Sequence, residues 1–94
     1  MTAHATASMT LTLVNRRGLH ARASAQLARL AADLTPTLMV AKSGEAVRAT
    51  SIMGLMMLGA AYGDAITVTA EGPDGEAAVK SVADLVARRF GEAS

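Results

Sequence analysis

The hydrophobic pattern changes its period several times along the chain, and this alternation constrains the fold more than any other feature of the sequence. Between Met9 and Val14, apolar side chains alternate with threonines, which is typical of a strand covered on one face. From Ala21 to Leu34 the apolar residues follow a helical spacing, and Pro36 sets the far limit of that helix. A chain with both patterns is expected to combine strands and helices.

The remaining elements follow from the same reasoning. Two short apolar segments, 38–41 and 46–49, flank Gly44, which can supply the positive φ of a tight turn, so they are expected to form an antiparallel hairpin. A short helix and a strand are predicted over residues 52–58 and 65–70, and a final helix is predicted from its N-cap Asp74 to Phe90. The order βαββαβα favours an α+β open-faced β-sandwich, a four-stranded and mainly antiparallel sheet with three helices on one face.

The length and composition of the chain support one domain. Of its 94 residues 51% are hydrophobic, so a single core can bury roughly 60 to 65% of the unfolded surface. Residues 9–91 are expected to form this domain, and residues 1–8, which are mostly small or polar, to form a flexible tail. No internal repeat, linker or second domain is visible, and a complete small protein is favoured over a domain of a longer one.

Charge and composition disfavour several classes of function. The formal net charge is +1 and only Tyr62 and Phe90 are aromatic, so the chain offers a nucleic acid neither a broad positive field nor stacking platforms. No apolar run approaches the roughly 20 residues that span a bilayer. The absence of cysteine excludes thiolate metal sites and is compatible with the cytoplasm, the expected location. Because catalytic and metal motifs are also absent, we expect no metal, no cofactor and no independent enzyme activity.

His20 is the first candidate for chemistry. It stands in the segment Gly18–Arg22 (GLHAR), where the strand pattern gives way to the helical one. An imidazole with its unperturbed pKa of about 6.5 is largely neutral near pH 7 and keeps one nitrogen lone pair free. A helix that begins at Ala21 would direct unpaired N–H groups at an anion on that nitrogen, and Arg22 adds a permanent positive charge. From these residues alone, a polar cap on a surface turn is the simpler interpretation.

A second motif, Ser51–Met56 (SIMGLM), follows about thirty residues later and changes that interpretation. Together the two motifs resemble HPr, the histidine-containing phosphocarrier family of the bacterial phosphotransferase system, and the resemblance extends over residues 9–90. It implies the open-faced sandwich. It also implies that His20 accepts a phosphoryl group from phosphorylated Enzyme I and passes it to IIA-type proteins, with the phosphate on Nδ1 beside Arg22.

The resemblance also implies roles for residues near the two motifs. Ser51, an N-cap by its position, would be phosphorylated by an HPr kinase/phosphorylase. The implied docking patch for partners contains Arg22, Arg29, Ile52, Met53 and Met56. Leu55 and Leu58 are expected in the core instead. Ala23 stands where the family motif usually has proline, so the helix start gains an N–H group and the rigidity of the loop before it stays open.

Two other functions remain open at this point. The nitrogen-related branch of the same system has a carrier with the same chemistry but passes its phosphoryl group to regulatory IIA proteins. A small interaction or RNA-binding module could use the same layout of sheet and helices, although the balanced charge and the two aromatic residues argue against it. In each case we expect a monomer.

Overall fold

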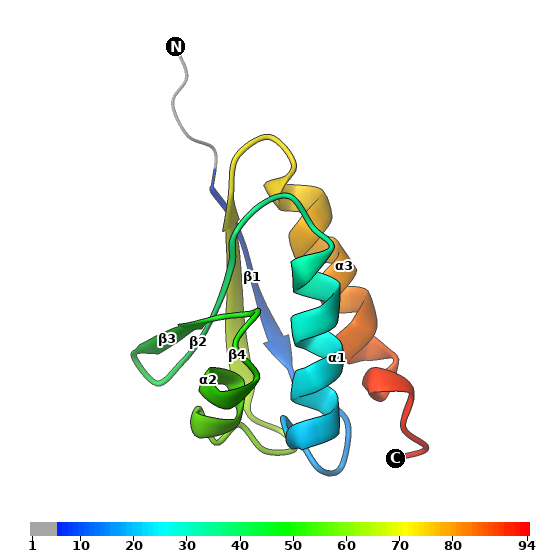
Figure 1. Cartoon of the computed structure of the whole chain (residues 1–94). Helices are drawn as coiled ribbons and strands as arrows, with labels where there is room; N and C mark the ends of the chain where they lie inside the picture. The colour runs from blue at the N-terminus through cyan, green and yellow to red at the C-terminus, as the bar shows by residue number, and fades with distance from the viewer. Residues whose placement is uncertain (1–5) are drawn as a thin grey trace.

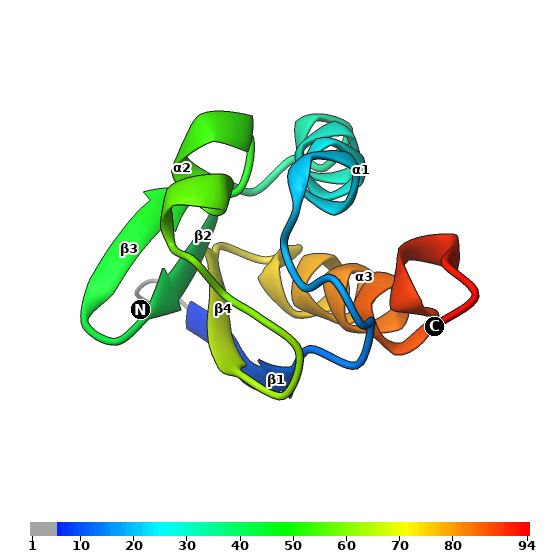
Figure 2. The ribbon, with the colours of Figure 1, turned by 90° about the horizontal axis from the view of Figure 1, so that it is seen from below.

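A computed structural model describes residues 6–94 of the chain (Figure 1). Its four antiparallel strands are β1 (Thr6–Thr12), β2 (Leu38–Lys42), β3 (Glu45–Arg48) and β4 (Ala65–Glu71), in the sheet order β1-β4-β2-β3. The helices are α1 (Ala21–Ala32), α2 (Ile52–Met57) and α3 (Gly75–Ala87), and a short 3-10 turn η1 (Arg89–Gly91) follows. Figure 2 shows the three helices on one side of the sheet, so the predicted open-faced sandwich and its order βαββαβα are confirmed.

β1 begins earlier than the hydrophobic alternation predicts. Residues 6–8, expected in the flexible tail 1–8, pair with β4 instead, with Thr6 opposite Glu71. Backbone pairing does not need an apolar side chain at every second position, and the N-terminal end of this edge strand is largely exposed. The strand therefore begins before the alternating residues do. Residues 1–5 of the expected tail lie outside the described residues.

The predicted hairpin is also present. Lys42 at the end of β2 lies opposite Glu45 at the start of β3. The two residues between them, Ser43 and Gly44, have φ angles of 52° and 86°. Positive φ at both central positions is the requirement of a type I′ turn, whose twist matches that of the two strands. Gly44 therefore has the conformation that the sequence predicts.

The core lies between the sheet and the helices. Its largest fully buried apolar side chains come from every layer: Phe90, Leu13, Leu27, Leu55, Ile66, Val40, Val68, Val79 and Val82. Full burial of one such side chain contributes roughly 1.5 to 3 kcal/mol. The core thus fixes α1 relative to α2 and to the C-terminal turn, and these three segments meet near the start of α1. Among the described residues, no helix has the length and apolar character needed to cross a membrane.

Candidate functional site

His20 lies immediately before α1, in extended backbone with φ −75° and ψ −178°. The first hydrogen bond of the helix runs from the Ser24 N–H to the His20 carbonyl oxygen, at 2.9 Å. The N–H groups of residues 21–23 therefore have no acceptor within the helix. These groups and the positive end of the helix dipole favour an anion close to the imidazole, and Ala23 in place of proline supplies one of them.

The loop before α1 is held by several hydrogen bonds. Asn15 Nδ2 donates to the Gly18 carbonyl at 2.8 Å, and the Gly18 N–H donates to the Asn15 carbonyl at 3.1 Å. Farther along, the Leu19 N–H donates to the Ala60 carbonyl at 3.0 Å. Ser24 Oγ, on the first turn of α1, donates to the Leu19 carbonyl at 3.1 Å. The loop is fixed without a proline in the first turn of the helix.

Gly18 allows this loop to pack against the segment that follows α2. Its φ is +62°, and a Cβ atom at this position would lie 2.4 Å from the Ala60 carbonyl oxygen and 2.7 Å from the Ala61 Cα. Any other residue would be strained by its backbone conformation and would clash with a backbone that cannot move aside. The contact brings α2 next to the histidine loop, as Figure 1 shows near the start of α1.

The C-terminal segment places a carboxylate on the imidazole. His20 Nε2 forms a hydrogen bond with Glu92 Oε2, and Asn15 Nδ2 donates to Glu92 Oε1 at 3.1 Å. An ionised carboxylate only accepts hydrogen bonds, so Nε2 must carry a proton, and in the neutral ring the lone pair is on Nδ1. Nδ1 is therefore the nitrogen that keeps a free lone pair in this arrangement.

The surroundings of Glu92 keep it ionised. Burial by itself raises the pKa of this carboxyl, but hydrogen bonds from His20 and Asn15 and electrostatic attraction to His20 and Arg17 lower it. The net pKa of Glu92 lies below its ordinary value. Glu92 consequently remains a hydrogen-bond acceptor for the imidazole at neutral pH.

A left-handed turn directs Glu92 toward α1. Arg89, Phe90 and Gly91 have φ angles of 56°, 54° and 78°, and left-handed backbone at a non-glycine residue costs about 1 to 2 kcal/mol. Two interactions offset this cost. The Phe90 side chain is 2% exposed, and the Phe90 carbonyl accepts a hydrogen bond from Gln26 Nε2 at 2.8 Å.

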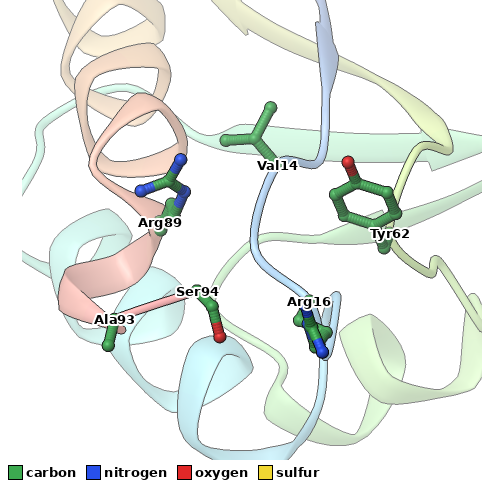
Figure 3. Close-up of a pocket in the computed structure, with 6 residues that line it drawn as sticks. All are labelled: Val14, Arg16, Tyr62, Arg89, Ala93 and Ser94. Carbon is green, nitrogen blue, oxygen red and sulfur yellow. The ribbon is translucent and has the colours of Figure 1, made fainter.

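Two open depressions at this end of the molecule are lined by arginines. The first, about 490 Å³, contains His20 and is lined by Arg16, Arg17, Arg22, Gly91, Glu92, Ala93 and Ser94. The second, about 530 Å³, does not contain His20 and is lined by Val14, Arg16, Tyr62, Arg89, Ala93 and Ser94 (Figure 3). Within residues 6–94, none of these four guanidinium groups forms an ion pair with a carboxylate. The first depression therefore combines the His20 imidazole with three arginines and one side-chain carboxylate, that of Glu92.

α2 presents an apolar surface beside this site. Ser51 caps the helix as predicted, because its Oγ accepts a hydrogen bond from the Gly54 N–H at 3.0 Å. Leu55 and Leu58 are buried, also as predicted. The exposed side chains, which we name the methionine face, are Ile52, Met53, Met56 and Met57, with 44%, 69%, 43% and 76% of their surface accessible. Met57 enlarges the surface beyond the predicted residues.

The predicted basic residues lie on α1. Arg22 lines the depression around His20, and Arg29 is exposed two helical turns farther along, on the same face of the helix. Arg29 therefore lies outside that depression. The described residues contain no group of three or more His, Cys, Asp or Glu side chains that could hold a metal ion.

Sequence reasoning missed Asn15 and Glu92. Neither residue belongs to the two motifs or to the predicted docking patch. The two residues are 77 positions apart and meet through the C-terminal turn, so no local pattern connects them. The one available signal was Gly91, which allows the chain to reverse directly before Glu92.

Known proteins resemble this chain in sequence and in structure. A family model described as "PTS HPr component phosphorylation site" matches residues 7–88. Phosphocarrier protein HPr of Cupriavidus necator is 44% identical over 81 residues, which cover 86% of this chain and 91% of that protein. Phosphocarrier protein NPr of Shewanella violacea is 37% identical over 84 residues, covering 89% and 92%. A crystal structure of HPr from Thermoanaerobacter tengcongensis superposes with a TM-score of 0.88 at 38% identity, covering 94% of this chain and 99% of that one.

Proposed function

The chain belongs to the HPr family of phosphocarrier proteins, and from this premise we propose that His20 accepts a phosphoryl group from phosphorylated Enzyme I and delivers it to a IIA-type protein. One observation carries the proposal. Glu92 accepts the hydrogen bond of Nε2 of the imidazole, so Nδ1 keeps its lone pair. His20 lines a depression together with Arg17 and Arg22. The protein acts as a carrier in this scheme, and its partners supply the catalysis.

The proposed step needs no proton transfer. The Nδ1 lone pair of His20 attacks phosphorus, a new N–P bond forms, and the bond between phosphorus and the donor breaks with its electron pair left on the donor. The imidazole becomes positively charged while Nε2 keeps its proton, and the carboxylate of Glu92 offsets that charge. Phosphoryl transfer depends mainly on positioning and electrostatics, which the docked partner completes.

The strength of the site suits a group that is held only briefly. The exposed N-terminus of a helix such as α1 stabilises an anion by about 0.3 to 1 kcal/mol. A charge-assisted hydrogen bond from Arg22 would add about 1.5 to 3 kcal/mol. The sum of a few kcal/mol steadies the phosphoryl group, yet it does not prevent transfer to the next protein.

We assign docking of both partners to the methionine face together with the basic side of α1. The face is apolar and exposed, and it adjoins the His20 loop through the hydrogen bond between Leu19 and Ala60. Methionine side chains adapt to surfaces of different shape, which suits a carrier that must bind two unrelated proteins in turn. Arg22 and Arg29 would contact acidic groups on those partners, and the carrier itself would remain a monomer.

Ser51 is the proposed second phosphorylation site, modified by an HPr kinase/phosphorylase. Ser51 is half-buried, and its hydroxyl oxygen accepts the hydrogen bond that caps α2. A dianion at this position is tolerated by the N-terminus of the helix but repels anionic partners. Incubation with the kinase and ATP, followed by intact mass measurement, should add one phosphate to the wild type and none to Ser51→Ala. A phosphate on Ser51→Ala would place the modification elsewhere.

The nitrogen-related branch is the second candidate, and the 37% identity to an NPr favours keeping it. Both branches use the same chemistry at His20, and both place the protein in the cytoplasm with its partners. Transfer to a sugar-type and to a nitrogen-type IIA protein, measured in parallel at equal concentrations, would separate them. The branch is given by the acceptor that is phosphorylated faster.

The central test uses phosphoenolpyruvate and Enzyme I. The wild type should gain one acid-labile, base-stable phosphoryl group, and His20→Ala should gain none while keeping the thermal transition of the wild type. His4→Ala is the matched control, because His4 is the only other histidine of the chain. Label retained on His20→Ala would contradict the proposal. An unphosphorylated wild type that binds RNA in a salt-dependent way would favour an interaction module instead.

A further inference from the structure

We propose that the methionine face is a site of reversible oxidation, at which conversion of Met53 and Met57 to sulfoxides weakens partner docking and so interrupts phosphoryl transfer. The inference rests on the docking role proposed above. It adds a chemical modification that docking alone does not require, and it places that modification on residues outside the phosphorylation chemistry.

The methionines of the chain are concentrated on one short helix. Met53, Met56 and Met57 all belong to the six-residue α2, and their spacing of three and four places them on one side of it. Their exposed fractions are 69%, 43% and 76%. Met9 and Met39, the other methionines within the described residues, lie singly on β1 and β2, with Met9 40% exposed and Met39 half-buried. The thioethers that an oxidant in solution can reach are therefore concentrated on α2.

No other side chain of the protein competes for a two-electron oxidant as a thiol would. The chain has no cysteine, so its six methionines contain all of its sulfur. With hydrogen peroxide as the oxidant, the thioether sulfur attacks one peroxide oxygen, an S–O bond forms, and the O–O bond breaks. The sulfur loses two electrons, the proton of the transferred oxygen moves to the second oxygen, and this second oxygen leaves as water. Susceptibility follows exposure, so Met53 and Met57 should react before Met56.

Oxidation of these residues should leave the fold intact. α2 is held by Leu55, which is fully buried, by Leu58, which is 8% exposed, and by the Ser51 cap. The sulfurs of Met53 and Met57 contribute to an exposed surface and not to the core. The oxidised protein therefore keeps His20 in its place with Glu92.

The same change should be costly at a docked interface. A sulfoxide oxygen is a strong hydrogen-bond acceptor, and an apolar contact surface offers it no donor. The penalty for one unsatisfied buried polar group corresponds to a loss of roughly 5- to 150-fold in affinity. Sulfoxide reductases, one for each epimer, would restore the thioether. The relay would thus slow and recover with its phosphorylation site unaltered.

The test compares the full chain before and after treatment with hydrogen peroxide. Peptide mass mapping should show oxygen first on Met53 and Met57. Transfer from phosphorylated Enzyme I, measured over a range of carrier concentrations, should then show KM raised about tenfold or more, with kcat nearly unchanged. Treatment with both sulfoxide reductases should return KM to its starting value.

A triple variant, Met53→Leu, Met56→Leu and Met57→Leu, provides the matched control. Leucine keeps the volume and the apolar character of the face, and the variant still contains Met9 and Met39. After peroxide treatment its KM should equal that of its untreated form. The inference is overturned if the variant loses docking as the wild type does, or if the oxidised wild type keeps its KM.

The test also separates this inference from the proposed function. If the untreated chain is not phosphorylated by Enzyme I, the proposed function fails and the inference fails with it. If the untreated chain is phosphorylated and the oxidised chain behaves identically, only the inference fails.

Discussion

Two neighbouring regions of the molecule are built in opposite ways. At the histidine end, which comprises Asn15, Gly18, His20 and Glu92, hydrogen bonds tie the loop to distant parts of the chain. Within residues 6–94, Asn15 Oδ1 is the one buried side-chain polar atom without a partner. On the methionine face, the side chains are exposed and make none of the hydrogen bonds found within residues 6–94. The two regions lie side by side because Leu19 at one of them binds the backbone of Ala60, which follows the other.

The difference shows how fixed chemistry and adaptable recognition can share one small surface. The proposed nucleophile, His20, must present one nitrogen in one orientation, and its imidazole is held by the Glu92 carboxylate, which also accepts a hydrogen bond from Asn15. A docking surface for several partners gains from side chains that can change rotamer, and methionine has three rotatable bonds. Rigidity is therefore needed only where a bond is made and broken.

Substitution of Gly18 should have the largest effect, because it breaks the rigid region at its closest backbone contact. Gly18→Ala combines a positive φ with a Cβ that would meet the Ala60 oxygen at 2.4 Å, so the free energy of unfolding should fall by about 2 to 4 kcal/mol. Gly59→Ala is the control, since its φ is also positive at 66° but no atom lies within 4 Å; it should cost about 1 kcal/mol. Urea titration measures both values, and equal losses would mean that the close contact is unimportant.

A charge on the methionine face should impair docking and leave the histidine end unchanged. Met53→Glu is expected to reduce transfer from Enzyme I and to IIA by about tenfold or more, because docking would bury an unpaired carboxylate. Its thermal transition should remain that of the wild type, since Met53 is 69% exposed. Ala77→Glu places the same charge at an exposed position in the first turn of α3, and the start of α3 lies at the opposite end of the molecule from the start of α1 (Figure 1), so this variant should transfer normally. Unchanged transfer by Met53→Glu would remove this residue from the docking surface.

Loss of the Glu92 charge should destabilise the histidine end, and the size of this loss of stability should depend on pH. The folded state lowers the pKa of Glu92, through hydrogen bonds from His20 and Asn15 that outweigh the opposing effect of burial. The carboxylate therefore stabilises the fold above the pKa of the unfolded carboxyl, and this contribution disappears as the pH falls through the folded pKa. Glu92→Gln should be less stable than the wild type by about 1 to 2 kcal/mol at pH 7, with a smaller difference in acid.

The same variant should slow phosphoryl transfer. A glutamine amide can either donate to Nε2 or accept from it, so the proton of the ring is no longer confined to Nε2. Nitrogen chemical shifts of the imidazole would report the tautomer directly. Glu45→Gln, at the exposed hairpin turn, is the control for loss of one negative charge. The stability measurement has its own contradictory outcome. If the difference in stability between Glu92→Gln and the wild type did not change with pH, Glu92 would act through packing alone.

The smallest effect should come from the cap of α2. Ser51→Ala removes the hydrogen bond from the Gly54 N–H and is expected to cost about 1 kcal/mol or less, because only one short helix loses a partner. Ser51→Thr should keep most of the stability. Phosphorylation of His20 by Enzyme I should proceed at a similar rate in both variants. A loss comparable to that of Gly18→Ala would show that α2 is as rigidly integrated as the histidine end.

Local sequence patterns predicted the elements but not all of their limits. The helical stripe before Pro36, the turn at Gly44 and the cap at Ser51 are all decided by residues close in sequence, and all three are present. β1 begins at Thr6 because its first residues form backbone pairs with β4, about sixty positions away in the sequence. The expected tail 1–8 contains no pattern that could reveal such pairing.

The residues of the candidate site also divide into those that a local motif predicts and those that only long-range contacts bring together. His20 and Arg22 are predicted from a single motif, and their positions at the helix start depend only on local geometry. Asn15 and Glu92 act through contacts across 77 residues, so they required the fold to be known. The exposure of Met57 was also missed, because an apolar residue on a short helix gives no sign of whether the core has room for it.

The position of the last residues affects how the protein can be handled in the laboratory. Ser94 lines both arginine depressions, one of which contains His20, so an affinity tag or an immobilisation linker attached there would emerge where Enzyme I and IIA are expected to dock. Thr6, where β1 begins, is at the opposite end of the sheet from the loop that carries the histidine (Figure 1). Biosensor measurements should therefore attach the chain ahead of β1.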